Sequence, residues 1–331
     1  MQADQACTNC PGSNTQLLIH QPSSLTRRAT MSPHTPALEC PELRIIELFA
    51  GIGGLAAAWP EAKVLAAIDI NQLAQRVYQQ NFSHRYYVQE IESLSIETLL
   101  GYSAECWWMS PPCQPFTRRG SLRDLADPRC RAFAHIVSAL QHCRPAKLGL
   151  ENVIGFENSQ AHRLLIAQLE TLGYHTRSCE LCPSHMGWPN RRPRFYLLAS
   201  QQPLPDWRVL PQWTCSLASL VDPELVPNSA RVAELLLPAT DLQQYFDALD
   251  RANLSSSFTA CFAGSYGKTI LQAGSYLQCG DGFRRFSPRE VARLLGFGDD
   301  FRLDGLSHRS AWKLLGNSLS LPCVRYVLSH F

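Results

Sequence analysis

Short runs of apolar residues alternate with longer amphipathic segments over most of the chain after residue 42. The short runs have the length and the apolar continuity of strands that are buried on both faces. They predict strands at residues 43–49, 63–70, 104–110, 147–151 and 194–200. The longer segments repeat apolar residues every three or four positions, which predicts helices at residues 71–82, 131–143 and 161–174, and again within 310–331. Strands that alternate with helices indicate an α/β fold with a mostly parallel sheet covered on both faces.

The pattern changes on either side of this alternating region. Residues 1–40 are rich in Pro, Ser, Thr and Gln and show no hydrophobic period, so we expect a flexible tail. Residues 201–302 are broken by prolines and predict a separate, smaller domain, whereas residues 303–331 return to an apolar helical pattern. We therefore expect one catalytic domain made of residues 41–200 and 303–331, with the smaller domain inserted between them.

Composition and charge narrow the class of protein. The 331 residues are 45% hydrophobic and 18% charged, with a net charge of +2, which is typical of a globular protein. No apolar run reaches the roughly 18 residues that cross a membrane, and we find no signal-peptide pattern. The thirteen cysteines are scattered, so we expect reduced thiols and a cytoplasmic or nuclear protein. The pairs Cys7–Cys10 and Cys179–Cys182 leave a zinc protein as an alternative, but one without histidines at finger spacing.

A glycine-rich turn follows the first predicted strand, and an acid ends the second. Gly51, Gly53 and Gly54 allow the backbone to approach a ligand, and Asp69 follows Gly51 by 18 positions. Ligands bind at the carboxyl ends of the strands in an open parallel sheet, where a carboxylate suits ribose hydroxyls. The turn does not have the GxGxxG pattern. It predicts a nucleoside cofactor, and both NAD and S-adenosylmethionine remain open at this step.

A cysteine follows the strand predicted at 104–110, behind two prolines. Cys113 is presented rigidly by these prolines, and the nearby Arg118 and Arg119 favour its nucleophilic thiolate form. Glu151 ends the strand predicted at 147–151, where an acid–base role is favoured over that of an ordinary surface carboxylate. A hydride-transfer enzyme needs neither group. The hypotheses of a dinucleotide-dependent oxidoreductase and of a catalytically inactive binding protein therefore account for fewer of these residues than the hypothesis of a group-transfer enzyme.

Arginines are concentrated in three runs, at residues 118–131, 191–194 and 284–293. A net charge of only +2 means that these runs are local patches rather than part of an overall basic surface. Such patches are typical of proteins that bind a polyanion. We expect them to flank the cleft and to contact nucleic acid.

Six motifs carry a resemblance to a known family. In chain order they are ELFAGIGG, SPPCQPFT, ENVIGFE, NRRPRFYLLA, RFSPREVARLLGF and LLGNSLS, and they span about residues 43–331. In this order and spacing they resemble the cytosine-5 nucleic-acid methyltransferase family. The segments PPCQPFTRRG and CFAGSYGKTILQAGSYLQ are most similar to the branch that methylates transfer RNA (tRNA). Ala263 replaces the threonine of that branch, and duplex DNA remains the alternative substrate.

The resemblance implies an S-adenosylmethionine-dependent, Rossmann-like methyltransferase domain with a smaller target-recognition domain. The implied catalytic residues are Cys113, Glu151, Arg192 and Arg194. The implied cofactor-binding residues are Phe49, Gly51, Gly53, Asp69, Ile70, Ile91, Pro112 and Asn317. The implied nucleic-acid contacts are Arg118, Arg119, Arg123 and Cys261.

The implied reaction is addition of the Cys113 thiolate to C6 of cytosine, methylation at C5, and release of the cysteine. Glu151 is expected to bind the N3 edge of the base, either protonated or ionised. The preferred substrate is a cytosine in a tRNA anticodon loop, with aspartate tRNA the first candidate, because a loop base is already partly unstacked. We expect a monomer that uses no metal and does not associate with membranes.

Overall fold

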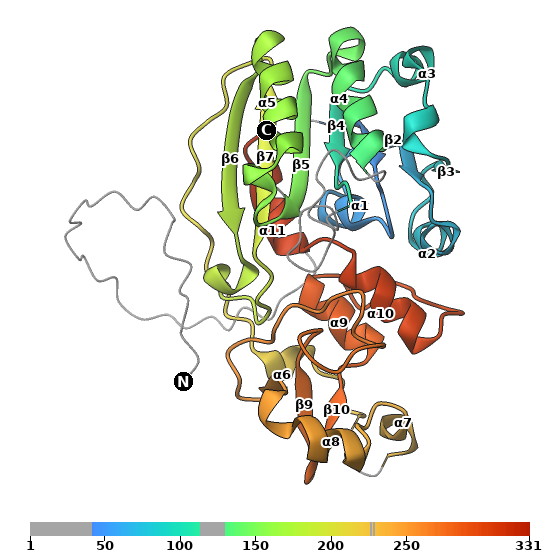
Figure 1. Cartoon of the computed structure of the whole chain (residues 1–331), viewed down its shortest axis with the longest axis vertical. Coiled ribbons are helices and arrows are strands. Elements are labelled where there is room, and N and C mark those ends of the chain that lie inside the picture. Colours follow the sequence, from blue (N-terminus) through green and yellow to red (C-terminus); the bar gives the residue numbers. More distant parts are fainter. Residues whose placement is uncertain (1–41, 113–129, 226, 228) are drawn as a thin grey trace, which may run out of the picture. The chain divides into compact units, whose positions relative to one another are not determined.

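The structure is a computed structural model of the 331-residue chain. It describes residues 42–112, 130–225, 227 and 229–331 (Figure 1). The tail predicted at residues 1–40 lies outside the described residues. Within the described ranges, none of the helices has both the length and the apolar character needed to cross a membrane.

A seven-stranded sheet has the strand order β3-β2-β1-β4-β5-β7-β6. Its strands are β1 (Arg44–Leu48), β2 (Lys63–Asp69), β3 (Tyr86–Val88), β4 (Cys106–Met109), β5 (Lys147–Val153), β6 (His175–Leu181) and β7 (Arg194–Ser200). The pairs from β3 through β5 are parallel, and β7 pairs antiparallel with both β5 and β6. The predicted α/β fold with a mostly parallel sheet is confirmed.

The two strands that the hydrophobic pattern did not predict are the edge strands. β3 has only three residues, and β6 reads HTRSCEL, with six of its seven residues at least partly exposed. An edge strand leaves one side unpaired and needs no apolar run. The strand predicted to end at Glu151 continues to Val153, so Glu151 stands inside β5.

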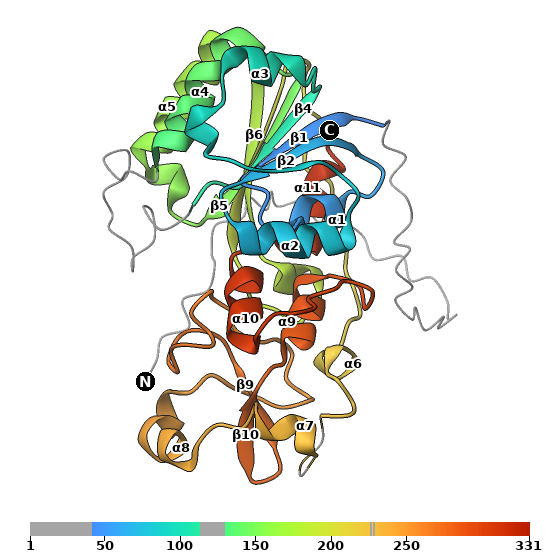
Figure 2. The same ribbon diagram turned by 90° about the vertical axis from the view of Figure 1, so that its right-hand side faces the viewer.

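Helices cover both faces of the large sheet (Figure 2). One face carries α3 (Ile96–Gly101), α4 (Arg131–Cys143) and α5 (Gln160–Thr171), and the other carries α1 (Gly54–Ala58), α2 (Gln72–Asn81) and α11 (Leu321–Leu328). Successive strand residues therefore enter different cores. Ile46 and Trp107 pack with α4, whereas Ile45 and Trp108 pack with α1. Burial on both faces is the reason that these strands are continuous apolar runs.

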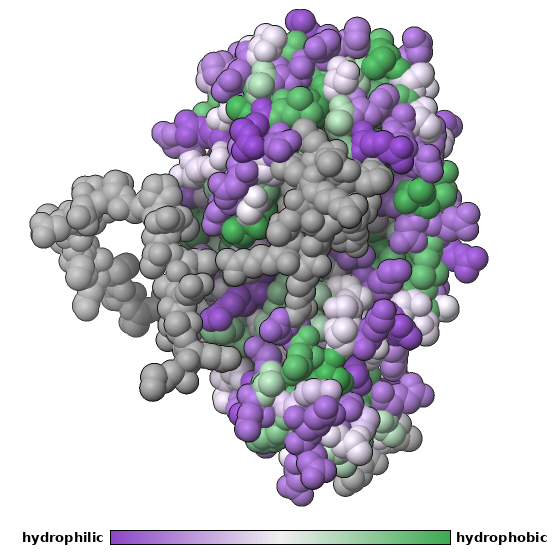
Figure 3. All heavy atoms as spheres, in the orientation of Figure 1, coloured by the Kyte–Doolittle hydropathy of each residue, from purple (hydrophilic) through white to green (hydrophobic). Residues whose placement is uncertain are grey.

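A second, three-stranded sheet has the order β10-β9-β8. Its strands are β8 (Arg251–Ala252), β9 (Tyr276–Cys279) and β10 (Gly282–Arg285), and the helices near it are α6 (Leu217–Leu220), α7 (Ala230–Ala233), α8 (Ala239–Tyr245), α9 (Pro288–Leu295) and α10 (His308–Gly316). Short 3-10 turns are η1 (Ile91–Ser93), η4 (Phe156–Asn158), η5 (Pro183–Met186) and η6 (Phe246–Ala248). Figure 3 shows hydrophilic residues spread over the visible surface of the described residues, with smaller hydrophobic areas between them.

Two tryptophans connect the second sheet and its helices with the rest of the fold. Trp188 Nε1 donates a hydrogen bond to Leu294 O in α9 at 2.8 Å, and Trp312 Nε1 in α10 donates to Phe286 O at 3.0 Å. These contacts cross the boundaries predicted between residues 41–200, 201–302 and 303–331. The division into a catalytic and a target-recognition domain stays a prediction.

A buried ion pair joins β10 to α9. Arg284 Nη1 and Nη2 donate to Glu290 Oε2 and Oε1 at 2.8 and 2.7 Å, and the two side chains are 1% and 0% exposed. The Glu290 carboxylate also accepts from the backbone N–H of Asp222 at 2.9 Å and of Ser287 at 2.7 Å. Each carboxylate oxygen therefore has two donors, which offsets the cost of burying the charge.

The same pair corrects the prediction of a nucleic-acid patch at residues 284–293. Arg284 is 1% exposed and neutralised by Glu290, so its charge does not reach the surface. Arg293 Nε lies 2.6 Å from Asp299 Oδ1, which neutralises a second arginine of this run. The prediction is wrong for Arg284, because a run of arginines in the sequence does not reveal which of them is buried.

We expect Arg284→Met to lower the free energy of unfolding by about 3–5 kcal/mol, because it leaves the Glu290 carboxylate buried without its cation. Urea denaturation followed by tryptophan fluorescence measures the loss. The matched control is Asp304→Ala, which breaks the pair between Arg302 and Asp304, whose side chains are both 62% exposed. Such a pair contributes roughly 0–1 kcal/mol. Equal losses in the two variants would contradict the role given to the buried pair.

Candidate active site

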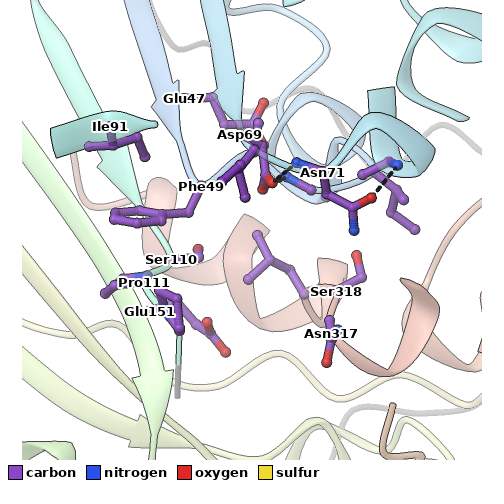
Figure 4. A pocket seen from close by; sticks show the side chains of 18 of the residues that line it. Glu47, Phe49, Asp69, Asn71, Ile91, Ser110, Pro111, Glu151, Asn317 and Ser318 are labelled. Carbon is purple, nitrogen blue, oxygen red and sulfur yellow. Dashed lines mark hydrogen bonds between the residues drawn. The ribbon is translucent and has the colours of Figure 1, made fainter. Parts of the chain in front are cut away.

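A cavity of about 490 Å³ opens at the carboxyl ends of β1, β2, β4 and β5. Its volume lies within the roughly 300–1,000 Å³ that is typical of ligand pockets. Figure 4 shows Phe49 and Ile91 on one side of the cavity, Asn317 and Ser318 on the other, and Glu151 toward the lower edge of the view. The cavity thus brings the glycine-rich turn, the residues after β4 and the C-terminal segment into one site, as expected for an open α/β sheet.

The turn after β1 uses backbone conformations that favour glycine. Phe49 and Gly51 have φ angles of 59° and 53°, and Gly53 has a φ of 87°. A Cβ added to Gly51 would meet no atom within 4 Å, so this glycine leaves open space beside the cavity that it lines. A Cβ added to Gly53 would lie 2.5 Å from the Phe82 ring, and Gly53 does not line the cavity. Gly53 therefore allows the turn to pack closely, whereas Gly51 borders the ligand space.

Asp69, at the end of β2, braces this turn. Its Oδ2 accepts a hydrogen bond from the Gly51 N–H and its Oδ1 accepts one from the Asn71 N–H, both at 2.9 Å. Asn71 in turn caps the start of α2 with its side-chain oxygen. Burial raises the pKa of Asp69, against the lowering effect of the two N–H donors. The neighbouring Ile70 lines the cavity and is 63% exposed, which is unusual for an isoleucine.

Glu151 in β5 is paired with Arg194 at the start of β7. Arg194 Nε lies 3.2 Å from Glu151 Oε1, and the two side chains are 14% and 10% exposed. Burial raises the pKa of Glu151, and the charges of Arg194 and Arg192 lower it by less, so the pKa stays above its usual value. Near neutral pH, this carboxyl therefore takes up a proton more readily than a surface glutamate does.

Arg192 also lines the cavity, and its guanidinium holds three backbone carbonyls. It donates to Phe262 O at 3.2 Å, to Gly316 O at 3.0 Å and to Ser318 O, and the residue is 2% exposed. Gly316 and Ser318 flank Asn317, so these hydrogen bonds fix the C-terminal segment at the cavity. The arginine acts here through the backbone that it positions.

Cys261 lies behind these two arginines. Its Sγ is 3.3 Å from Arg192 Nη1 and 3.9 Å from Arg194 Nη2. Burial by itself raises the pKa of the thiol, but the charges of the two guanidinium groups and their hydrogen bonds together outweigh burial, and the pKa of Cys261 is lowered. The side chain does not line the cavity. It is therefore placed to accept hydrogen bonds from the arginines rather than to contact a ligand in the cavity.

Most of the described residues that the resemblance implies come together in this one cavity. The residues that line it are Phe49, Gly51, Asp69, Ile70, Ile91, Pro112, Glu151, Arg192, Arg194 and Asn317. Gly53 and Cys261 lie outside its lining. Cys113, Arg118, Arg119 and Arg123 lie outside the described residues. Pro112, which directly precedes Cys113 in the sequence, borders the cavity.

A buried carboxyl that the sequence pattern did not single out also lines the cavity. Glu47 in β1 is 2% exposed, and its Oε2 accepts a hydrogen bond from the Tyr78 hydroxyl at 3.4 Å. The same hydroxyl lies 3.1 Å from His84 Nδ1. Burial raises the pKa of Glu47 to about 8. A signal was present in the sequence, because a charged residue within the apolar strand RIIEL is uncommon.

In the part of the chain that the structure describes, no group of three or more His, Cys, Asp or Glu side chains could hold a metal ion. Cys179 lies in β6 and Cys182 directly follows that strand, while Cys7 and Cys10 lie outside the described residues. The zinc alternative therefore has no support in the described ranges.

We expect the variant Glu47→Gln to gain stability relative to the native protein as the pH rises from about 5 to about 8. The unfolded chain releases this proton near pH 4.5, whereas the folded protein holds it up to a pKa of about 8, so the native protein loses stability across that window. Glutamine does not titrate, so the difference in unfolding free energy grows by roughly 1.4 kcal/mol per pH unit. Urea denaturation of both proteins at several pH values measures this difference, in which the other titrating groups cancel. A difference that stays constant with pH would contradict the raised pKa.

Comparison with known proteins places the chain in a family. It matches the family described as C-5 cytosine-specific DNA methylase over residues 43–214 and 264–331. A Schizosaccharomyces pombe relative named tRNA (cytosine(38)-C(5))-methyltransferase is 30% identical over 325 residues, covering 88% of this chain and 97% of the relative. A human protein of the same name is 29% identical over 379 residues, covering 85% of this chain and 97% of that protein. The solved structure of S. pombe Dnmt2 methyltransferase covers 87% of this chain and 98% of its own, with 28% identity and a TM-score of 0.77.

These matches confirm the family that the six sequence motifs indicated, and the structural similarity confirms the methyltransferase fold. The family match covers more than half of the chain. Enzymes of this family transfer a methyl group from S-adenosylmethionine to C5 of cytosine. The chain therefore belongs to the C-5 cytosine-specific DNA methylase family and is an S-adenosylmethionine-dependent cytosine-5 methyltransferase.

Proposed function

We propose that this enzyme methylates C5 of a cytosine in the anticodon loop of a tRNA, with aspartate tRNA as the first candidate. The main support for this reaction is the ion pair between Glu151 and Arg194, which lies in the cavity bordered by the glycine-rich turn. Pro112 lines the same cavity, and Cys113 follows it in the sequence. Methylation of cytosine requires an acid, a cation and a thiol; the first two line this cavity, and the thiol follows Pro112 in the sequence.

The cavity residues fit S-adenosylmethionine. Gly51 leaves open space for a ligand, and Ile70 offers an exposed apolar surface beside the carboxylate of Asp69. This combination suits a flat adenine next to a ribose. The residues that would hold the cofactor are Phe49, Gly51, Asp69, Ile70, Ile91, Pro112 and Asn317, with Gly53 shaping the turn. When bound, S-adenosylmethionine supplies an electrophilic methyl group.

Cys113 supplies the nucleophile in this proposal. Cytosine C5 does not take a methyl group unaided, because it is too weak a nucleophile in the aromatic ring. Addition of the thiolate to C6 forms a carbon–sulfur bond and moves the C5–C6 electron pair to C5, which becomes nucleophilic. After methylation, loss of the C5 proton restores the double bond and expels the cysteine as a thiolate. The methyl group remains on C5, and the cysteine is regenerated.

Glu151 acts at the N3 edge of the base. Because burial raises the pKa of this carboxyl, its protonated form is available to donate to N3 when the thiolate adds to C6. Arg194 lies 3.2 Å from the carboxyl, orients it and stabilises its ionised form after the proton leaves. Arg192 fixes the backbone on either side of Asn317 and is a positioning residue.

Two observations support tRNA as the substrate. The relatives named tRNA (cytosine(38)-C(5))-methyltransferase match this chain over 88% and 85% of its length. The match to the DNA methylase family omits residues 215–263, which contain part of the second sheet and its helices. A short recognition segment suits the shape of a folded RNA better than base-pair reading along a major groove. A loop cytosine also leaves its stack at lower cost than a paired one.

An aspartate tRNA transcript should accept labelled methyl groups from S-adenosylmethionine, and duplex DNA should not. The matched control is a transcript with the target cytosine changed to uridine. Cys113→Ala should abolish transfer, whereas Cys261→Ala should retain part of it, because that thiol does not line the cavity. A transcript with 5-fluorocytosine at the target should trap the native enzyme as a denaturation-resistant adduct, because fluorine does not leave C5 as a proton does.

Each part of this proposal can fail separately. Methylation of duplex DNA alone would overturn the tRNA substrate and leave the reaction intact. Normal turnover by Cys113→Ala would overturn the covalent mechanism, whichever nucleic acid is methylated.

Asp69→Ala should weaken the binding of S-adenosylmethionine by roughly 1.5–3 kcal/mol, because it removes a ribose acceptor and releases the Gly51 N–H. Glu151→Gln should leave that affinity almost unchanged and lower kcat instead, since glutamine cannot deliver the proton. Titration calorimetry and single-turnover kinetics on the two variants measure these effects. Equal losses of affinity would contradict the roles assigned to the two carboxyls.

A further inference from the structure

An arginine and a phenylalanine form an exposed stacked pair close to the site. The guanidinium carbon of Arg191 lies 4.1 Å from the centre of the Phe258 ring. Arg191 is exposed, and Phe258 is 40% exposed although it is a large apolar residue. Leu254, in the same loop as Phe258, is 54% exposed. Neither the activity nor the cofactor fit described above uses these side chains.

Backbone hydrogen bonds tie this pair to the catalytic residues. The Arg191 N–H donates to Thr259 O at 2.8 Å, and the Thr259 N–H donates to Pro189 O at 3.1 Å. The two segments thus run side by side, and the next residue, Arg192, contacts Cys261. Three residues of extended chain span at most roughly 11 Å, so Phe258 is within that distance of Cys261 along the backbone. Nucleotides that flank a base bound in the cavity would therefore come near the pair.

The loop that carries Phe258 is held by its own hydrogen bonds. Asn253 Oδ1 accepts from the Ser255 N–H at 2.9 Å, and the Asn253 N–H donates to Ser256 Oγ at 2.9 Å. On the other side, the buried Asn190 side chain donates to Thr259 Oγ1 at 3.0 Å. The ring is thus presented from a fixed backbone. Binding on it would not require the loop to become ordered first.

We propose that Phe258 and Arg191 form a stacking site for an unpaired nucleotide that flanks the target cytosine. This inference rests on the proposed tRNA substrate and deepens it. RNA loops are recognised by stacking of splayed bases on aromatic rings and on guanidinium planes. The exposed part of the Phe258 ring offers the apolar surface for a base, and the charge of Arg191 attracts the adjacent phosphate.

The position of Phe258 in the sequence supports a role in substrate choice. Residues 215–263, which include Phe258, lie outside the match to the DNA methylase family, whereas Arg191 lies inside it. The pair therefore joins a segment outside the family match with a segment inside it. A stacking residue in that place holds the substrate close to the reacting groups without touching them.

The molecule contains a matched control for this inference. The guanidinium carbon of Arg251 lies 4.2 Å from the centre of the Phe246 ring, and Phe246 is 43% exposed. This second pair has the same chemistry and exposure, and Phe246 is separated from Phe258 by 12 residues. Phe246→Ala therefore removes an equivalent exposed ring without touching the proposed stacking site.

The test is steady-state methylation of aspartate tRNA by Phe258→Ala, Phe258→Trp and Phe246→Ala. We expect Phe258→Ala to raise KM for tRNA by about 5- to 150-fold, the range seen when one stacked base loses its aromatic partner. Phe258→Trp should stay close to the native value, and so should Phe246→Ala. Calorimetric binding of S-adenosylmethionine should be unchanged in all three, which shows that each variant is folded. Equal KM values for the two alanine variants, or a loss in Phe258→Trp as large as in Phe258→Ala, would overturn the inference.

A binding measurement separates this inference from the proposed function. An anticodon stem-loop carrying 2-aminopurine at each loop position in turn should lose fluorescence on binding at one position next to the target, because the base stacks. The quenching should persist in Phe246→Ala and disappear in Phe258→Ala. This fluorescence measurement needs no methyl transfer. If the native enzyme quenches the 2-aminopurine but does not methylate tRNA, the proposed activity is overturned and the stacking site is not. Identical quenching in both variants would overturn the stacking site alone.

Discussion

Arg192 places a permanent charge at a position that is 2% exposed, and its two terminal nitrogens donate to backbone carbonyls from two distant segments. A buried guanidinium without partners would cost several kcal/mol, so both segments must stay in place while the arginine does. One segment contains Phe262, and the other runs through Gly316 and Ser318 between α10 and α11. A Cβ on Gly316 would lie 2.3 Å from the Ala263 carbonyl carbon, so the two segments also pack in direct contact. The cavity-lining segment around Asn317 and the thiol of Cys261 are both held by this one side chain.

Burial has different chemical consequences for Glu47, Asp69 and Glu151, three of the carboxyls that line the cavity. Desolvation raises the pKa of Glu47, Asp69 and Glu151 alike, but the groups that oppose it differ. Asp69 receives two backbone N–H donors, which favour its ionised form and leave it an acceptor for hydroxyl groups. Glu151 has the cation of Arg194 beside it, which lowers its pKa by less than burial raises it. Burial outweighs the hydrogen bonds that Glu47 receives from the Leu55 backbone and the Tyr78 hydroxyl, and its pKa rises to about 8. The partners, rather than burial itself, assign each carboxyl its role.

The central strands could be predicted from the sequence because burial on both faces leaves a continuous apolar run. The long helices could be predicted because burial of one stripe leaves a periodic pattern. The helix predicted at residues 131–143 has those bounds in α4, whereas the edge strands β3 and β6 leave no such pattern. The site could be located because the carboxyl ends of parallel strands meet, which places Gly51, Asp69 and Glu151 together. The contacts of Arg192 could not be predicted, since its carbonyl partners lie up to 126 positions away in the sequence. Burial of Arg284 was missed for a related reason, because its partner Glu290 appears in the sequence as an ordinary surface charge.

Arg191 and Arg192 are adjacent in the sequence, but one side chain is exposed and the other is buried. This arrangement connects the proposed nucleotide-stacking site with the cavity. Arg192 turns inward and holds the catalytic backbone, whereas Arg191 turns outward and stacks on Phe258. Thr259 is fully buried and aligns its segment with both arginines through hydrogen bonds to Pro189, Asn190 and Arg191. Because these hydrogen bonds come mainly from the backbone, the exposed side chains can differ without moving the buried ones. The segments of Arg191 and Thr259 also hold Arg192 and Cys261. A nucleotide that binds on their outer side would therefore have a fixed position relative to the cavity.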